Sequence, residues 1–487
     1  MSLNAEDDES LNGYDGGGLN AGSELEDEQI FEAPVIAGEA PTLNEDVTLI
    51  TSIHNQAMDL GYLAQSIAQQ GGMSQDLALE CEQLRPGTLG VPIGSFSSIP
   101  TATRYKVSLE AIGKGIWALV AAATAAVIAA IIKLYSWISG KKSGNGTAKD
   151  AEKSMEQEAK DVDETADGLE KAAKAAQQAA DIIKEEKPEV AVEEEGSAKT
   201  YLTLDELIED AFLDQKHQRA KRFLETRDPI LYDLIHQGPY YTAILNASKV
   251  VPLIVSALKE KLAGLREVVR LDANAKTVTD QILNSSNVKA LSKPIEVQFN
   301  GTTMSIDALA THLSQTKATA ASQETEERMS FDRLFDTMAK TYRTNPVGAL
   351  FQQLQLALDT IAEMDKELQA LQKKTGKLST DGFVDQASGE LGTLIREAVL
   401  KTMEDISAIA QVTHQAKGYA AKLRHMGNEA VGLGEEIARR VSFLLSKQGM
   451  QPPSAWAKVT KDLKELHREL MKNSKIRFVD EQMKGSF

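Results

Sequence analysis

The chain has 487 residues, a net charge of −18 and only 5% aromatic residues. This length allows two to four domains, and the abundance of alanine, glutamate, lysine and leucine favours helices. The single cysteine, Cys81, excludes an internal disulfide framework, and nothing else in the composition argues for an oxidising compartment.

The negative charge is concentrated at the N-terminus, where 17 Asp and Glu residues precede the first basic residue, Arg85. Residues 1–46 combine acidic runs with glycine and few large apolar side chains, a composition typical of disorder. The segment lacks the basic start and apolar centre of a secretory signal, and nucleic-acid phosphates would repel it. We expect either a self-repelling tail or a segment directed at a partner.

Two more segments separate this acidic region from the first strongly apolar stretch. Residues 47–84 carry apolar groups at helical spacing on both sides of Gly71-Gly72, which predicts a short helical hairpin. Residues 85–100 are rich in proline, glycine and serine and are typical of a linker.

Residues 115–132 form an uncharged run of 18 residues within a predicted apolar helix at 111–140. As a helix the run is about 27 Å long, which is at the lower limit for spanning a bilayer. Its large aliphatic side chains, Ile116, Val120, Val127 and Ile131, share one face. Trp117 and Trp137 lie near its ends, as aromatic residues at a membrane interface do. Ala118, Ala122, Ala126 and Ala130 form a ridge on the opposite face. A membrane-entering segment and a buried helix of a soluble bundle both fit.

Residues 141–199 contain an alanine-rich heptad pattern. One column recurs every seven residues, at Met155, Val162, Leu169, Ala176 and Ile183. Alanines stand four residues after each of the first four members, so the pattern predicts a slim coiled-coil seam against another helix of this chain or of a second copy. Pro188 and the acidic run 193–196 are expected to end the helix.

Residues 200–487 are expected to form a helical body. Periodic segments predict helices at 346–374, with Gly376 as the stop, and at about 390–425, 428–447 and 454–473. The one β signal is at 295–306, where Asn300-Gly301 predicts a type I′ hairpin. The expected fold class is mainly α: an elongated helical bundle with coiled-coil segments, one small β-hairpin and a disordered acidic N-terminus.

A search for catalytic chemistry finds no site. The seven histidines are scattered, and the sequence contains no zinc-protease, P-loop, dinucleotide-binding or nucleophile-elbow motif. We therefore expect no enzyme activity, no cofactor and no metal. The stretch from Trp456 is mildly basic, with acidic residues interleaved, so it gives only a weak signal for a phosphate-binding face.

The junction Ser108-Leu109-Glu110, followed by Ala111 and the apolar helix, carries a family resemblance. It resembles the internal head, or inner body, proteins of giant tailed bacteriophages of the phiKZ kind. Members of that group carry N-terminal propeptides, which a prohead protease removes after a small residue, any residue and glutamate. Two further triplets fit as earlier cuts, namely Ala37-Gly38-Glu39 and Ala78-Leu79-Glu80. The resemblance covers residues 1–140.

The resemblance implies a non-enzymatic virion protein inside the phage head, matured by cleavage after Glu110 and ejected with the DNA. Its implied partners are other capsid-interior proteins, further copies of itself, the prohead protease, packaged DNA and, after ejection into the host envelope or cytoplasm, the host membrane. The chain then divides into a leader (1–110), the apolar helix (111–140), the coil and acidic linker (141–199) and the body (200–487). An α-helical membrane-inserting or pore-forming protein and a cytoplasmic coiled-coil adaptor stay open as alternatives.

Charge gives this cut a physical purpose. Residues 1–110 contain 18 acidic and three basic groups, whereas residues 111–487 are close to neutral. An acidic leader suits a basic scaffold or capsid lining during assembly, and its removal would reduce repulsion from packaged DNA.

Overall fold

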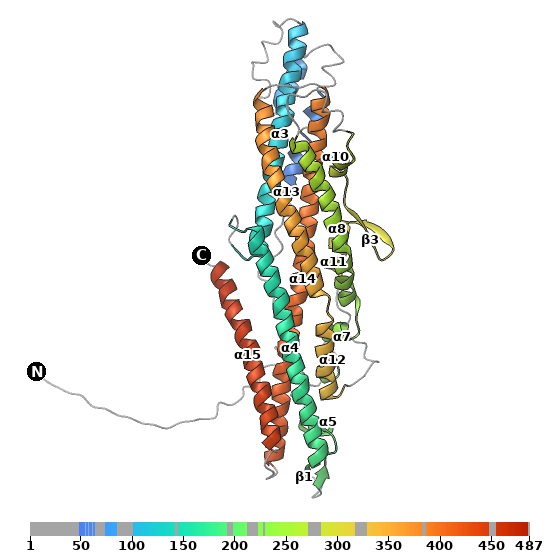
Figure 1. The fold of residues 1–487 in the computed structure, drawn as a ribbon, viewed down its shortest axis with the longest axis vertical. Coiled ribbons are helices and arrows are strands. Elements are labelled where there is room, and N and C mark those ends of the chain that lie inside the picture. Colours follow the sequence, from blue (N-terminus) through green and yellow to red (C-terminus); the bar gives the residue numbers. More distant parts are fainter. Residues whose placement is uncertain are drawn as a thin grey trace, which may run out of the picture.

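The protein is mainly α-helical, as the sequence predicts, and forms an elongated bundle in a computed structural model (Figure 1). The expected disordered segment 1–46 lies outside the described residues. The structure describes residues 48–53, 55–56, 58–60, 62–63, 74–84, 101–141, 145–191, 198–211, 223–226, 229–270, 284–316, 329–381, 386–447 and 454–485.

The elements follow the chain after a set of helical residues between 48 and 63. They are α2 (Gln75–Leu84), α3 (Thr101–Ile138), α4 (Ala148–Glu186), β1 (Glu189–Ala191), β2 (Ala198–Thr200), α5 (Leu204–Ala211), α7 (Pro229–Ile235), α8 (Pro239–Arg270), α10 (Ser286–Leu291), β3 (Glu296–Phe299), β4 (Thr302–Ser305), α11 (Ile306–Gln315), α12 (Phe331–Arg343), α13 (Val347–Asp381), α14 (Gln386–Lys447) and α15 (Ser454–Gly485).

Helix α14 is the spine of the bundle. Its 62 residues correspond to about 93 Å. Helices α3, α8 and α13 lie around one half of its length, and α4, α12 and α15 lie around the other half (Figure 1). Three turns or helix starts meet near its middle: the α3–α4 turn, the α12–α13 turn and the start of α8.

Specific contacts place the two turns and the start of α8 at the same height along α14. The Lys417 ammonium of α14 donates to the Ile138 carbonyl at the end of α3, at 3.1 Å. Two residues on, Tyr419 meets Tyr240 at the start of α8 edge to face, with ring centroids 4.9 Å apart. The neighbouring Tyr241 hydroxyl donates to the Thr344 carbonyl in the α12–α13 turn, at 3.4 Å. Among the described helices, α14 therefore continues past the level at which α3 is followed by α4, α12 is followed by α13, and α8 begins.

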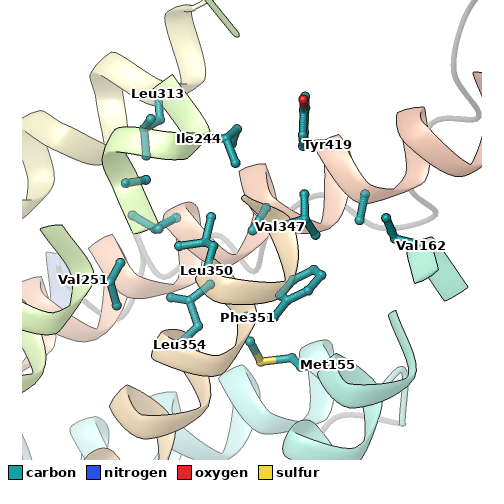
Figure 2. Packing of buried hydrophobic residues seen from close by; sticks show 14 of the residues in the cluster. Met155, Val162, Ile244, Val251, Leu313, Val347, Leu350, Phe351, Leu354 and Tyr419 are labelled. Atoms are coloured by element: carbon teal, nitrogen blue, oxygen red, sulfur yellow. The ribbon is translucent and has the colours of Figure 1, made fainter. Parts of the chain in front are cut away.

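The core next to this level is built on α13, as Figure 2 shows. Phe351 of α13 faces Met155 of α4, while Leu350 and Leu354 face Val251 of α8. The periodic apolar residues of this helix, which recur at heptad spacing in two columns, are all buried: Leu350, Leu354, Ala357, Ile361, Met364, Leu368 and Leu371. Asn345 caps the start of this helix, because the Val347 amide donates to Asn345 Oδ1 at 2.9 Å.

The heptad column of α4 lies in the core, although its second column differs from the expected one. The buried first column is Met155, Val162, Leu169, Ala176 and Ile183. The second buried column lies three residues after Val162, Leu169 and Ala176, at Thr165, Ala172 and Ala179, rather than four. Of the expected alanines only Ala166 is fully buried, while Ala159, Ala173 and Ala180 are half-buried. The seam packs against α12, α14 and α15, since α4 has neighbours on several sides.

Helix boundaries differ from the sequence prediction at glycine positions. Helix α13 passes Gly376 and ends at Asp381, and the helices expected at 390–425 and 428–447 are one helix. At Gly427 an added Cβ would overlap the Thr165 methyl group of α4. This glycine therefore allows two helices to approach closely instead of ending one of them. Helix α15 also runs beyond the expected end at residue 473.

The strands form two small antiparallel pairs. In the pair β3–β4, Phe299 lies opposite Thr302, and Asn300 and Gly301 have φ values of 50° and 79°, so the expected type I′ turn is confirmed. The pair β1–β2, with Val190 opposite Lys199, was not expected, because strands of three residues leave little periodic signal.

One buried ion pair joins α8 to the spine. Lys261 and Asp405 are each 3% exposed, and the ammonium donates to Asp405 Oδ2. Burial raises the pKa of the Asp405 carboxyl to about 6, although the Lys261 charge opposes this shift. Such a pair fixes helix register more than it adds stability.

We expect Lys261→Met to lower the free energy of unfolding by about 3–5 kcal/mol at pH 7, because it leaves a buried carboxylate without a counter-charge. The double variant Lys261→Met, Asp405→Leu should recover most of that loss, since neither charge then remains. Urea unfolding followed by circular dichroism measures both. A single variant as stable as the parent chain would show that the pair is not buried.

Candidate functional site in the apolar helix and its junction

Helix α3 contains the apolar segment and packs between α13 and α14. Its large apolar face is buried: Ile116, Trp117, Val120, Val127, Ile131 and Leu134 are each at most 7% exposed. Trp137 is half-buried. Of the two readings left open by the sequence, this arrangement matches the buried helix of a bundle.

The alanine ridge of α3 lies toward the outside. Ala122 is exposed, Ala118 and Ala126 are half-buried, and only Ala130 is fully buried. The described part of this outer face carries no charge before Lys133, which is half-buried. Helix α3 is therefore apolar on the face that packs and weakly apolar on the face that does not.

Two described helices are long and apolar enough to cross a membrane by length and composition. They are Gly115–Ile138, with a mean hydropathy of 2.4, and Pro239–Arg270, with 1.4, and 56% and 50% of these windows are buried. The second one, α8, was missed in the sequence because Lys249 and Pro252 interrupt its apolar stretch. The signal that could have found it is the helical spacing of the apolar residues on both sides of Pro252, namely Val250, Val251, Ile254, Val255 and Leu258.

The aromatic and basic groups that resemble membrane anchors have partners within the protein. Lys417 lies 5.7 Å from the centroid of the Trp137 ring, and His414 packs on the same ring. Lys141 pairs with Asp150 at 2.7 Å. The Tyr135 hydroxyl donates to the Leu358 carbonyl at 3.3 Å, so α3 is fastened to α13 as well. Release of α3 from the bundle would break the contacts of Trp137 and Tyr135.

The junction Ser108-Leu109-Glu110-Ala111 lies inside α3 and not at its start. The helix begins at Thr101, so it crosses the boundary expected between residues 110 and 111. Its N-terminal turns project beyond the ends of α13 and α14 (Figure 1). Helix ends open at lower free energy than packed helix interiors, and α3 is packed from Ile116 onward.

Of the two earlier candidate cleavage sites, the structure describes one. Ala37-Gly38-Glu39 lies outside the described residues. Ala78-Leu79-Glu80 lies in α2, with Ala78 buried and Leu79 48% exposed. A cut there would first require α2 to unwind.

Part of the expected leader contributes to the core. Ile50, Ile53, Leu60 and Leu63 are buried, and Met58 contacts Arg396 of α14. The two helical segments of the expected hairpin are present, and their connection lies outside the described residues. The described residues between 48 and 63 are therefore packed on the body.

Two carboxyl groups meet where α4 passes α13. Glu152 and Asp359 share a hydrogen bond, and this contact, followed by burial, raises the pKa of Glu152 to about 7. Glu156 raises this pKa further, and Lys149 lowers it. Burial and then Asp365, Asp359 and Glu152 raise the pKa of the nearby Tyr135 hydroxyl. The contact between α3, α4 and α13 thus holds excess negative charge.

Among the described residues, no group of three or more His, Cys, Asp or Glu side chains is placed to hold a metal ion. Comparison with known proteins gives no match: no family model, no curated protein and no solved structure is similar to this chain.

We expect Glu152→Gln to remove part of the pH dependence of stability. A pKa raised above its unfolded value means that the folded state holds a proton, so this contribution is lost as the pH rises from about 4.5 to about 7. The variant should match the parent at pH 4.5 and exceed it at pH 8 by about 0.5–1 kcal/mol, because solvent screens a half-exposed pair. Thermal unfolding at both pH values measures this. Glu156→Gln removes only a smaller contribution to this pKa shift and should give a smaller gain, so an equal gain from it would contradict the assignment.

Proposed function

We propose that the chain is a non-enzymatic structural protein of the interior of a phage head, matured by cleavage between Glu110 and Ala111. The observation that carries this proposal is the position of the junction: it follows the acidic leader and stands in the projecting end of α3. The long helix α14 also suits a structural protein, because it stays as one continuous helix when the leader is removed.

Cleavage inside a helix requires local unwinding, and the residues after the junction favour it. Gly113 and Gly115 lie within five residues of the scissile bond. Each glycine in a helix costs about 1 kcal/mol relative to alanine. The projecting part of α3 is therefore the part that a protease can open most readily.

The identity of the mature N-terminus tests the proposal. A peptide map of purified particles should lack residues 1–110 and contain a semi-specific peptide that starts at Ala111. Abundant peptides from residues 1–110 in those particles would contradict the proposal.

We expect Gly113→Ala to slow processing about fivefold, which corresponds to roughly 1 kcal/mol of added helix stability. Glu110→Ala should abolish processing, because the protease reads that carboxylate. The readout is intact mass against time in cells that produce both the chain and the protease. Short peptides spanning 104–118, with glycine or alanine at 113, should be cut at equal rates; unequal rates would place the effect in recognition and not in unwinding.

A second candidate function is membrane insertion, which the composition of α3 and α8 favours. In the uncut chain the apolar face of α3 is packed, so this function requires that loss of the leader frees the helix. Aliphatic residues at the centre of a spanning helix contribute only about 0.3–0.6 kcal/mol each, and alanine contributes little, so insertion would be marginal.

Flotation with liposomes distinguishes the two functions. Membrane insertion predicts that a chain of residues 111–487 floats while the chain of residues 1–487 does not. If neither form floats and the fluorescence of Trp117 stays unshifted with lipid, α3 acts as a core helix only.

A further inference from the structure

Arg396 is a buried arginine near the start of α14. Its side chain is 2% exposed. Its Nη2 donates to the Met58 sulfur at 3.1 Å, and its Nε has no hydrogen-bond acceptor. A thioether is a weak acceptor, so the guanidinium has lost most of the hydrogen bonding that water provides.

No described carboxylate forms an ion pair with Arg396, in contrast to Arg424, a half-buried arginine further along this helix. Arg424 pairs with Asp161 at 3.0 Å and with Glu158 at 3.1 Å, both from α4. Burial lowers the pKa of Arg396, and the negative charge of its sequence neighbour Glu397 only partly offsets this. A buried cation without a paired anion is unfavourable wherever it occurs.

The helical segment 48–63 supplies the cover over this guanidinium. Met58 contributes the contacting sulfur, and Ile50, Ile53, Leu60 and Leu63 of the same segment are buried. Beside it, Ile116 of α3 lies 3.3 Å from where a Cβ at Gly392 would stand, one helical turn before Arg396. Apolar contacts therefore hold the segment on the body, while burial of the guanidinium opposes them.

We propose that Arg396 is an oxyanion-binding site that segment 48–63 covers, so that an anion and this segment compete for one guanidinium. The ligand is a carboxylate or phosphate group, because the fork of guanidinium N–H donors matches two oxygens of either group. Displacement of the segment opens the site, and binding of the anion restores the missing hydrogen bonds. This inference goes beyond the structural role and does not depend on cleavage at Glu110.

Hydrogen exchange in the full-length chain tests this competition. Amide exchange in peptides from segment 48–63 is measured in inorganic phosphate, in acetate and in chloride at equal ionic strength. Phosphate should speed exchange of this segment at least threefold relative to chloride. A matching effect of acetate extends the site to carboxylates, whereas no effect of acetate restricts it to phosphate groups. Equal exchange in all three salts would overturn the proposal.

Two substitutions locate the effect at the guanidinium. Arg396→Met removes the buried charge at similar length, so exchange of segment 48–63 should slow several-fold and lose its response to phosphate. Met58→Glu puts a carboxylate where the sulfur lies and should have the same two effects, which keeps the test valid if Arg396→Met folds poorly. Arg424→Met is the matched control and should leave the phosphate response intact. A phosphate response that persists in Arg396→Met, or faster exchange in both variants, would refute the site.

Discussion

The bundle depends on the continuity of α14. The α3–α4 column and the α12–α13 column both break near the level of Lys417 and Tyr419, and α8 starts there. Without one helix that crosses this level, the two halves would be separate bundles joined by turns. The contacts at the crossing are polar as well as apolar, because each chain break leaves carbonyls that need donors, such as the Ile138 carbonyl that Lys417 satisfies.

Charge burial fixes the register of the spine in each half. Lys261 of α8 meets Asp405 on one side of the crossing level, and Asp161 of α4 meets Arg424 on the other. Apolar seams rich in alanine and leucine tolerate sliding by one turn, whereas a displaced ion pair would leave a buried charge unpaired. Arg396 differs from these pairs, since a segment of the leader and not a carboxylate covers it.

The parts of the fold that follow from local periodicity could be predicted from the sequence. The seam of α4 at Met155 and Leu169, the columns of α13 and the Asn300-Gly301 turn all arise from short-range patterns. The continuity of α14 could not be predicted, because Gly427 has the composition of a helix end and its purpose is set by Thr165, more than 250 residues away.

The residues of the candidate site could be predicted from the sequence, but their tertiary contacts could not. The buried face of α3 follows from residues such as Val120 and Val127, and the junction triplet is visible in the sequence. That the junction lies within α3, and that residues 48–63 pack on the body, depends on tertiary contacts. Arg396 did leave a signal, since it lies in an apolar stripe between Ile395 and Val399, where a charged residue is unexpected.

A distance along α14 tests this arrangement most directly. Spin labels at Glu404→Cys and Ser446→Cys, in a chain with Cys81→Ser, lie 42 residues apart on either side of Gly427. One continuous helix predicts a single distance of about 63 Å by pulsed electron spin resonance. A helix broken near Gly427 and folded back would place the labels less than about half as far apart, and a distribution centred there would contradict the continuous spine.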